Sequence, residues 1–468
     1  MAKRFLPFDL NQPFLLPPDL REWVPEEHLA RFILDVVEAL DLSKLMAAYR
    51  KNSDRGRSGY HPKMLLGLVL YGYCTGTRSS RQIERKTYED VAYRVLSGNQ
   101  HPDHDSIASF RQRHLELIAK LFVQVLRLCQ EAGLVKLGNV AIDGTKVKAN
   151  ASKHKAMSYD RMGETEKRLE AEVKALLEAA AQNDTEEDTR FGKGKRGDEL
   201  PEELARRESR LVKIRAAKAA LEKEAKEKAE REAGEAKAKK EERRRKEEAT
   251  GKNVGGRPAQ VLDADKAVPE PKAQRNFTDP ESRIMKDGAT KNFEQAYNAQ
   301  AAVDSASQVI VGTAVTQEGN DKKQLVPMLL AVEKQAGALP KSASADAGYF
   351  SAAAVTDLRL AQVELLVPPD RQKHAQQEAA PSGPRNADAP IMDKMREKLR
   401  SPEGEAIYKL RKQVVEPVFG QIKEARGIRR FSFRGLRKVA AEWDIICLTH
   451  NLLKLFRSGT RLRAAAPA

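Results

Sequence analysis

The chain has 468 residues, and its 83 lysines and arginines against 67 aspartates and glutamates give a net charge of +16. This length allows two or three domains with cores of their own, and the positive charge favours polyanionic partners such as nucleic acids. The three cysteines stand far apart, which argues against a zinc site or a disulfide framework. No apolar run approaches the about 20 residues of a membrane span, and the N-terminus lacks a signal-peptide core, so we expect a cytoplasmic protein outside any membrane.

Residues 1–135 form the first predicted domain, which is entirely helical. Apolar residues such as Ile33 and Val36 recur at helical spacing, and residues 64–77 are apolar on nearly every side, as in a helix inside a bundle. Short helices with basic residues in a first turn, such as Arg81, are typical of a helix-turn-helix DNA reader. An ordinary helical bundle with solvated arginines explains the same pattern equally well.

Residues 156–262 form a charged insertion. Two stretches rich in Ala, Glu, Lys and Arg each carry one narrow apolar stripe, with Leu169 in the first and Leu211 and Ile214 in the second. The stripes predict an antiparallel helical hairpin or short coiled coil. After Leu221 the apolar positions stop, so we interpret the remainder as a solvated helix that becomes a linker.

The segments on either side of the insertion, residues 136–155 and 263–457, together predict one α/β domain, followed by a disordered tail at residues 458–468. The predicted order is a strand, the insertion, an antiparallel pair of strands, a helix, a strand, a helix, a buried strand, a mobile loop at residues 372–390, and terminal helices. Three leading strands followed by alternation imply a mixed sheet with helices on both faces.

Two aspartates stand at strand ends in this order. Asp143 ends the first predicted strand and Asp346 ends the fourth. In a sheet with parallel neighbouring strands, the loops that follow these strands meet at one edge of the sheet, and ligands usually bind there. A third acid, Glu416, comes from a helix after the last strand. Three converging carboxylates need cations, and hard oxygen ligands without His or Cys favour Mg²⁺ or Mn²⁺.

Taken singly, each of these acids is better explained as a turn residue or as an acid at a helix start. Their places in the strand order together favour a metal site. Two ions about 3.5–4 Å apart would serve phosphodiester cleavage or strand transfer.

Several motifs resemble those of the DDE transposases of bacterial insertion sequences, which are cut-and-paste enzymes with an RNase H-like catalytic core. Residues 140–152 and 345–351 resemble the two aspartate motifs of that family, and residues 415–455 resemble its C-terminal motif. Residues 13–33 and 101–114 resemble the helical domain that precedes the core. The resemblance covers nearly the whole chain, with its motifs in the family's order.

The resemblance implies roles for particular residues. Asp143, Asp346 and Glu416 would form the catalytic triad that binds two Mg²⁺ ions, with Mn²⁺ able to substitute. The family also carries a signature of Tyr, Arg, Glu and Lys, matched here by Tyr408, Arg411, Glu416 and Lys423.

The interval from Arg411 to Glu416 is one residue longer than in the family. On a helix, Lys412 lies closer to the Glu416 face than Arg411 does, so either basic residue remains a candidate for DNA contact. Pro417 disfavours helical angles at the residue before it, so the helix is expected to restart there.

Further basic residues are candidates for the DNA backbone. Arg429 and Arg430 lie in a segment that interleaves arginines with phenylalanines, which suits a DNA track. Lys146 and Lys148 alternate onto one side of the chain that leaves Asp143.

We therefore predict a transposase that cleaves DNA at the ends of an insertion sequence and transfers the freed strand into target DNA. Water would attack the phosphodiester at the element's end, and the freed 3′-OH would attack the target. The helical N-terminal domain would read the terminal inverted repeats, and the pairing of two ends requires at least a homodimer on DNA. No small-molecule substrate is expected.

Two alternatives remain open. One is a host nuclease with the same RNase H-like core, and the other is a catalytically silent, domesticated DNA-binding or scaffold protein. The intact triad argues against the silent protein, whereas the long Lys/Glu-rich hairpin is what a scaffold would show.

Overall fold

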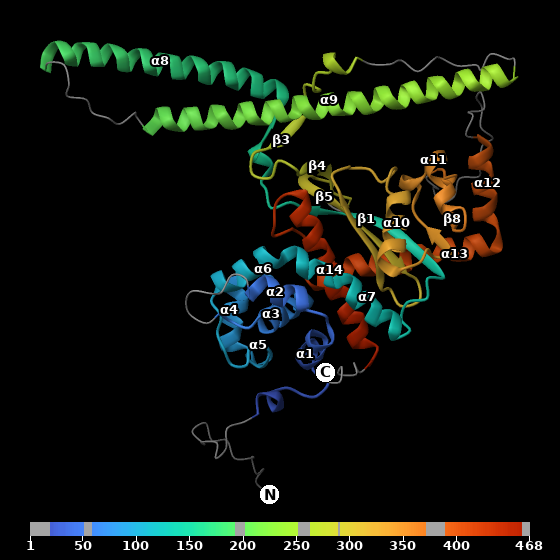
Figure 1. Ribbon diagram of the computed structural model, residues 1–468. Helices are drawn as coiled ribbons and strands as arrows, with labels where there is room; N and C mark the ends of the chain where they lie inside the picture. Colours follow the sequence, from blue (N-terminus) through green and yellow to red (C-terminus); the bar gives the residue numbers. More distant parts are fainter. Residues whose placement is uncertain are drawn as a thin grey trace, which may run out of the picture. The chain divides into compact units, whose positions relative to one another are not determined.

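The computed structural model describes residues 19–50, 59–191, 202–250, 263–288, 291–370 and 389–460 (Figure 1). The chain divides into two compact units, residues 1–147 with 297–468 as the first and residues 148–296 as the second. The predicted linker before residue 263, nearly all of the predicted mobile loop and most of the predicted tail lie outside the described residues.

The first unit begins with seven helices after a short 3-10 turn at Leu20–Trp23. They are α1 (Leu29–Ala39), α2 (Ser43–Arg50), α3 (Pro62–Thr75), α4 (Ser80–Glu89), α5 (Val91–Leu96), α6 (His104–Ala119) and α7 (Leu121–Glu131). Helix α3 is buried along nearly its whole length, as its all-round apolar sequence predicts. The helical nature of this N-terminal region is thereby confirmed.

Five strands of the first unit form a mixed sheet in the order β6-β5-β1-β7-β8. They are β1 (Asn139–Lys148), β5 (Phe293–Asp304), β6 (Ile310–Thr316), β7 (Ser342–Ser344) and β8 (Glu364–Leu366). Strands β5 and β6 pair antiparallel, whereas β7 pairs parallel with both β1 and β8. The predicted order of strands and the mixed sheet are both confirmed.

The remaining helices of this unit pack on the sheet or follow its strands. They are α10 (Leu325–Ala336), η4 (Ala347–Tyr349), α11 (Ala352–Val355), η5 (Leu358–Leu360), α12 (Ala389–Arg400), α13 (Pro402–Gly420), the π-helical turn η6 (Gln421–Ala425) and α14 (Leu436–Arg457). Helices α10 and α14 both contact β6, and α13 contacts β7.

Helix α14 lies between the N-terminal helices and the sheet (Figure 1). It contacts α3, α6 and α7 on one side and β6 on the other, and Trp443, Ile446 and Cys447 are fully buried. Its buried polar side chains therefore form hydrogen bonds inside the protein. The side chain of Asn451 accepts a hydrogen bond from the Ile310 N–H and donates one to the Ile310 carbonyl, each 2.8 Å long.

The second unit consists of two long helices and short strands. They are β2 (Ala156–Ser158), α8 (Tyr159–Phe191), α9 (Glu202–Thr250), β3 (Gln274–Asn276) and β4 (Arg283–Lys286), with short 3-10 turns at Lys153–Lys155 and Ala264–Lys266. Strand β2 pairs antiparallel with β3, and β4 pairs with residues 293–296, the part of β5 that belongs to this unit.

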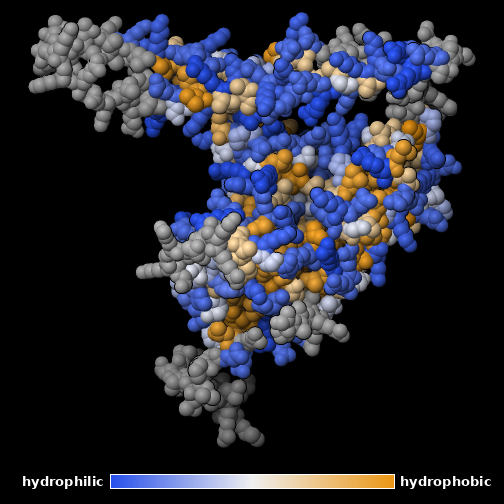
Figure 2. Space-filling view, in the orientation of Figure 1, coloured by the Kyte–Doolittle hydropathy of each residue, from blue (hydrophilic) through white to orange (hydrophobic). Residues whose placement is uncertain are grey.

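Helices α8 and α9 pack antiparallel, as the two apolar stripes predict. Leu169, Leu211, Ile214 and Leu221 lie in one buried cluster with Met162. Outside that cluster the surface of the two helices is mostly hydrophilic (Figure 2). Within the described residues, no helix is both long and apolar enough to cross a membrane.

Replacement of Asn451 by alanine should lower the free energy of unfolding of the first unit by about 2–4 kcal/mol. The change leaves the buried N–H and carbonyl of Ile310 without partners, and each such group costs about 1–3 kcal/mol. Urea unfolding followed by tryptophan fluorescence measures this, because Trp443 is buried in the same helix. Gln112→Ala, at an exposed position of α6, is the control, and an Asn451→Ala protein as stable as this control would contradict the assignment.

Candidate active site

The candidate site lies where β1 and β7 part. Residues Val140, Ala141 and Ile142 are fully buried, and β7 pairs with β1 only at Asn139–Ala141. Asp143 is the fifth residue of β1, and the strand continues to Lys148, so the prediction that it ends at Asp143 is wrong. The strand persists because β5 continues alongside it after β7 has ended.

Asp346 follows the end of β7 by two residues. It caps the 3-10 turn η4, with its side chain accepting a 2.8 Å hydrogen bond from the Gly348 N–H. Since β1 and β7 are parallel, Asp143 and Asp346 lie on the same side of the sheet, as predicted for the ends of neighbouring parallel strands.

The carboxylates of this site interact electrostatically. Burial raises the pKa of Asp143 to about 6, the Arg411 guanidinium opposes the rise, and the negative charges of Asp346 and Asp321 add to it. One oxygen of Asp143 accepts a 2.8 Å hydrogen bond from the Gly144 N–H. The neighbouring acids thus make the charged form of Asp143 costly, which a nearby cation would relieve.

Helix α13 supplies the principal counter-charge. The Nη1 atom of Arg411 lies 3.3 Å from Oδ2 of Asp143, and the Arg411 side chain is only 9 % exposed. Its guanidinium lies 5.8 Å from the centre of the Tyr408 ring. Burial raises the pKa of Tyr408, and Arg411 opposes that rise. Of the two basic candidates, Arg411 is therefore the one at Asp143, whereas Lys412 is exposed.

Pro417 does not interrupt α13, and the expected restart of the helix at this residue is wrong. A proline inside a helix lacks the N–H that would bond to the carbonyl four residues earlier, here that of Gln413. The side chain of Gln308 donates a 3.0 Å hydrogen bond to this carbonyl instead. The helix therefore stays continuous to Gly420 and then widens into the π-helical turn η6, a feature often found at functional sites.

Glu416 and Lys423 lie near this widened turn. Glu416 is exposed on α13, and Lys423 donates a 2.8 Å hydrogen bond from Nζ to the carbonyl of Lys146 in β1. The Lys146 side chain in turn lies 3.7 Å from Asp321. Burial lowers the pKa of Lys146, while Asp321 and Asp143 act to raise it.

Asp321 is the one acid of this site that the sequence motifs did not single out. Its Oδ1 accepts hydrogen bonds from the side-chain amides of Asn298 (2.6 Å) and Gln300 (2.7 Å). The side-chain oxygen Oε1 of Gln300 accepts a short hydrogen bond from the hydroxyl of Tyr349, which lies in the turn that Asp346 caps. Residues 321–329 resemble a segment that lies between the two aspartate motifs of the DDE transposases, but the position of Asp321 shortly before α10 is explained equally well by a helix start.

Three other predicted DNA-binding residues lie outside this group. Arg429 pairs with Glu424 and Arg430 is exposed, both just before α14. Lys148 belongs to the second unit, where it pairs with Glu294 at 3.1 Å.

The oxygen donors present suit a hard divalent cation. Asp143, Asp346 and Asp321 contribute carboxylates, and the buried Oδ1 of Asn298 has no hydrogen-bond partner. In the described part of the chain, however, no three His, Cys, Asp or Glu side chains are grouped as a formed metal site.

Two segments match known protein families. Residues 18–113 match the family described as Transposase domain (DUF772), and residues 256–452 match the family described as Transposase DDE domain. The second match includes Asp346 and Glu416 but begins after Asp143. No curated protein and no solved structure matches the chain.

The order of the two matches identifies the class of protein: the chain is a DDE transposase of an insertion sequence. Its mixed sheet is therefore the RNase H-like core of that family, preceded by a helical transposase domain. It acts on DNA as a metal-dependent endonuclease and strand transferase in transposition. Neither alternative, a host nuclease or a silent scaffold, receives support from the matches.

Replacement of Gly144 by alanine should lower the melting temperature and reduce DNA cleavage by more than about tenfold. A Cβ atom there would lie 2.3 Å from Nε2 of Gln300 and 2.9 Å from oxygens of both Asn298 and Asp321, so the side chains beside Asp143 would have to move. Thermal unfolding and a cleavage assay measure the two effects. Gly138→Ala is the matched control because a Cβ there meets nothing within 4 Å, and equal behaviour of both variants would contradict the prediction.

Proposed function

We propose that Asp143, Asp346 and Glu416 bind two Mg²⁺ ions, for which Mn²⁺ can substitute, and that this triad catalyses the cleavage and strand-transfer steps. The observation that carries the proposal is the electrostatic coupling of Asp143 and Asp346 at neighbouring parallel strands. When bound, the ions activate the attacking oxygen and stabilise the leaving oxygen.

The position of Glu416 on α13 supports its role as third ligand. Glu416 precedes the π-helical turn η6, in which Lys423 lies. Lys423 reaches the Lys146 carbonyl, three residues after Asp143 in β1. The carboxylate of Glu416 is exposed, so a cation can reach it.

Arg411 orients Asp143 in this proposal. Its buried guanidinium holds Oδ2 of the aspartate, while the Gly144 N–H holds Oδ1. Lys146 of β1 and Lys423, which bonds to the Lys146 carbonyl, contact the phosphate next to the cut as point charges. The other proposed contacts to the DNA backbone are Tyr408, Lys412, Lys148, Arg429 and Arg430.

The reaction runs in two steps on this assignment. Water attacks the phosphodiester at the element's end, which breaks a P–O bond and leaves a free 3′-OH on the element. That 3′-OH then attacks a phosphodiester of the target, so that one P–O bond forms as another breaks. The N-terminal helices read the terminal inverted repeats, two ends are held by at least a dimer, and the protein works at the nucleoid in the cytoplasm.

Asp143→Asn, Asp346→Asn and Glu416→Gln should each reduce cleavage by more than about 100-fold, because each removes one charged ligand. The substrate is a duplex with the inverted repeat found in the DNA that flanks the gene. Binding of this duplex, measured by fluorescence anisotropy, should stay within about threefold of the unmodified protein. Chelation of divalent ions should abolish cleavage, and added Mg²⁺ should restore it.

Asp105→Asn is the control for loss of an acid, since the Asp105 side chain is 88 % exposed on α6. Full activity of the Asp143 and Asp346 variants would refute the proposed triad. Full activity of Glu416→Gln alone would refute the third ligand only, and flanking DNA without inverted repeats would instead favour a host nuclease.

A further inference from the structure

A fully buried carboxylate connects the basic segment before α14 with the N-terminal helices. Glu442 of α14 has no solvent exposure, and the four residues that it contacts in the described part of the chain, Tyr73, Arg78, Ser432 and Phe433, lie outside the candidate active site. Its Oε2 accepts hydrogen bonds from the backbone N–H groups of Ser432 (2.8 Å) and Phe433 (3.1 Å). Its Oε1 accepts one from the Tyr73 hydroxyl, 3.1 Å away.

Such a carboxylate is stabilised only by its donors, because burial of an unpaired charge is very costly. The two backbone N–H groups belong to residues 427–435, which we name the basic loop. Since both donate to one oxygen, the position of Glu442 sets the course of the loop at Ser432 and Phe433.

Two arginines of the N-terminal helical region hold the same loop. Arg78 lies 3.7 Å from Glu442 and donates a 2.8 Å hydrogen bond to the carbonyl of Arg430. Arg111 of α6 donates a 2.6 Å hydrogen bond to the carbonyl of Arg78, and its guanidinium lies 5.3 Å from the centre of the Phe433 ring. The loop is therefore held by residues from both of the segments that match a transposase family.

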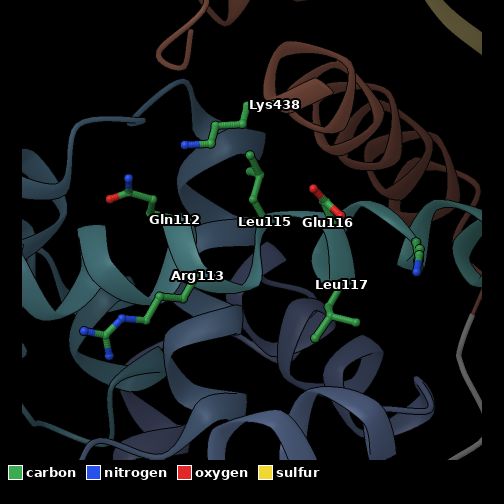
Figure 3. A pocket seen from close by; sticks show the side chains of 7 residues that line it. Gln112, Arg113, Leu115, Glu116, Leu117 and Lys438 are labelled. Carbon is green, nitrogen blue, oxygen red and sulfur yellow. The ribbon is translucent and has the colours of Figure 1, made fainter. Parts of the chain in front are cut away.

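With its backbone held from inside, the basic loop directs cationic side chains outward. Arg429, Arg430 and Arg434 are exposed, whereas Phe431 is buried against the Trp443 ring. A separate hollow lies on α6 and the start of α14, and one acid, Glu116, is among the residues that line it (Figure 3). Its cationic lining residues are Arg113, Lys120 and Lys438.

We propose that the basic loop and the hollow on α6 together form one surface for the DNA backbone, and that Glu442 is the positioning residue that joins them. The proposal rests on the proposed function for its choice of DNA as the polyanion. It adds that contact with phosphates is shared by the helical and catalytic segments. A single rigid surface results, because the same buried carboxylate bonds to α3 through Tyr73 and to the basic loop.

The test is the salt dependence of binding to a 30-base-pair duplex of arbitrary sequence. Each phosphate contact contributes about 0.9 to the slope of log K against log salt concentration. Arg430→Ala should therefore lower the slope by about 1. Glu442→Gln should lower the slope by about 1–2, although the substitution changes no surface charge. Glutamine has one acceptor oxygen where glutamate has two, so its –NH₂ group would face a donor that now bonds to the carboxylate.

Two variants distinguish a positioning role of Glu442 from a general effect on the stability of the protein. Asn451→Ala weakens the same helix α14 without touching the loop, so it should lose stability but keep the slope. Arg78→Lys keeps the charge but not the forked donor to the Arg430 carbonyl, so it should lower the slope even if Glu442→Gln does not fold.

An unchanged slope for Arg430→Ala and for the Arg430→Ala, Arg434→Ala double variant would overturn the surface. An unchanged slope for both Glu442→Gln and Arg78→Lys would overturn the role of Glu442. A slope lowered as much by Asn451→Ala as by Glu442→Gln would overturn it as well. Neither result bears on the triad, because the cleavage variants Asp143→Asn and Asp346→Asn are predicted to keep their DNA binding.

Discussion

The burial of most of helix α14, from Val439 to Leu455, is the constraint on which the first unit depends. A helix buried in protein has to satisfy its polar side chains internally, and here three of them bond to different parts of the chain. Asn451 pairs with the backbone of β6, Glu442 holds the basic loop, and the indole N–H of Trp443 donates a 2.9 Å hydrogen bond to the Gln300 carbonyl. Since Gln300 also bonds to Asp321, the packing of α14 extends to the catalytic strands.

At the candidate site, the arrangement of charges is the dominant physical feature. Burial and the negative charges of Asp346 and Asp321 raise the pKa of Asp143, and the Arg411 guanidinium opposes this rise. The Lys146 side chain lies 3.7 Å from Asp321. Burial is the main cause of the raised pKa of Asp143 and the neighbouring acids add to it, so a nearby cation would stabilise the charged carboxylate. The site thus brings carboxylates and basic side chains together, as the proposed metal and phosphate contacts require.

The long insertion separates Asp143 from the rest of the catalytic core in sequence but not in the sheet. Strand β1 occupies the centre of the sheet between β5 and β7, although the second unit lies between β1 and most of β5 in the chain. The match to the DDE domain starts at residue 256 and so leaves Asp143 out. Only the pairing of β1 with β7 brings Asp143 to Asp346, and Asp143 is therefore assigned by sheet topology rather than by the match.

The sequence by itself determined the strand order, the helical N-terminal region, the paired apolar stripes of α8 and α9, and the association of Asp143 with Asp346. These features follow from local periodicity and from the rule that parallel strands end on one side of a sheet. Tertiary structure alone decided that Arg411 rather than Lys412 reaches Asp143, that Gln308 allows α13 to pass through Pro417, and that Asp321 and Glu442 organise their surroundings. The physical reason is that periodicity encodes which face of an element is buried, whereas the partner of a buried polar group depends on distances between residues far apart in the chain.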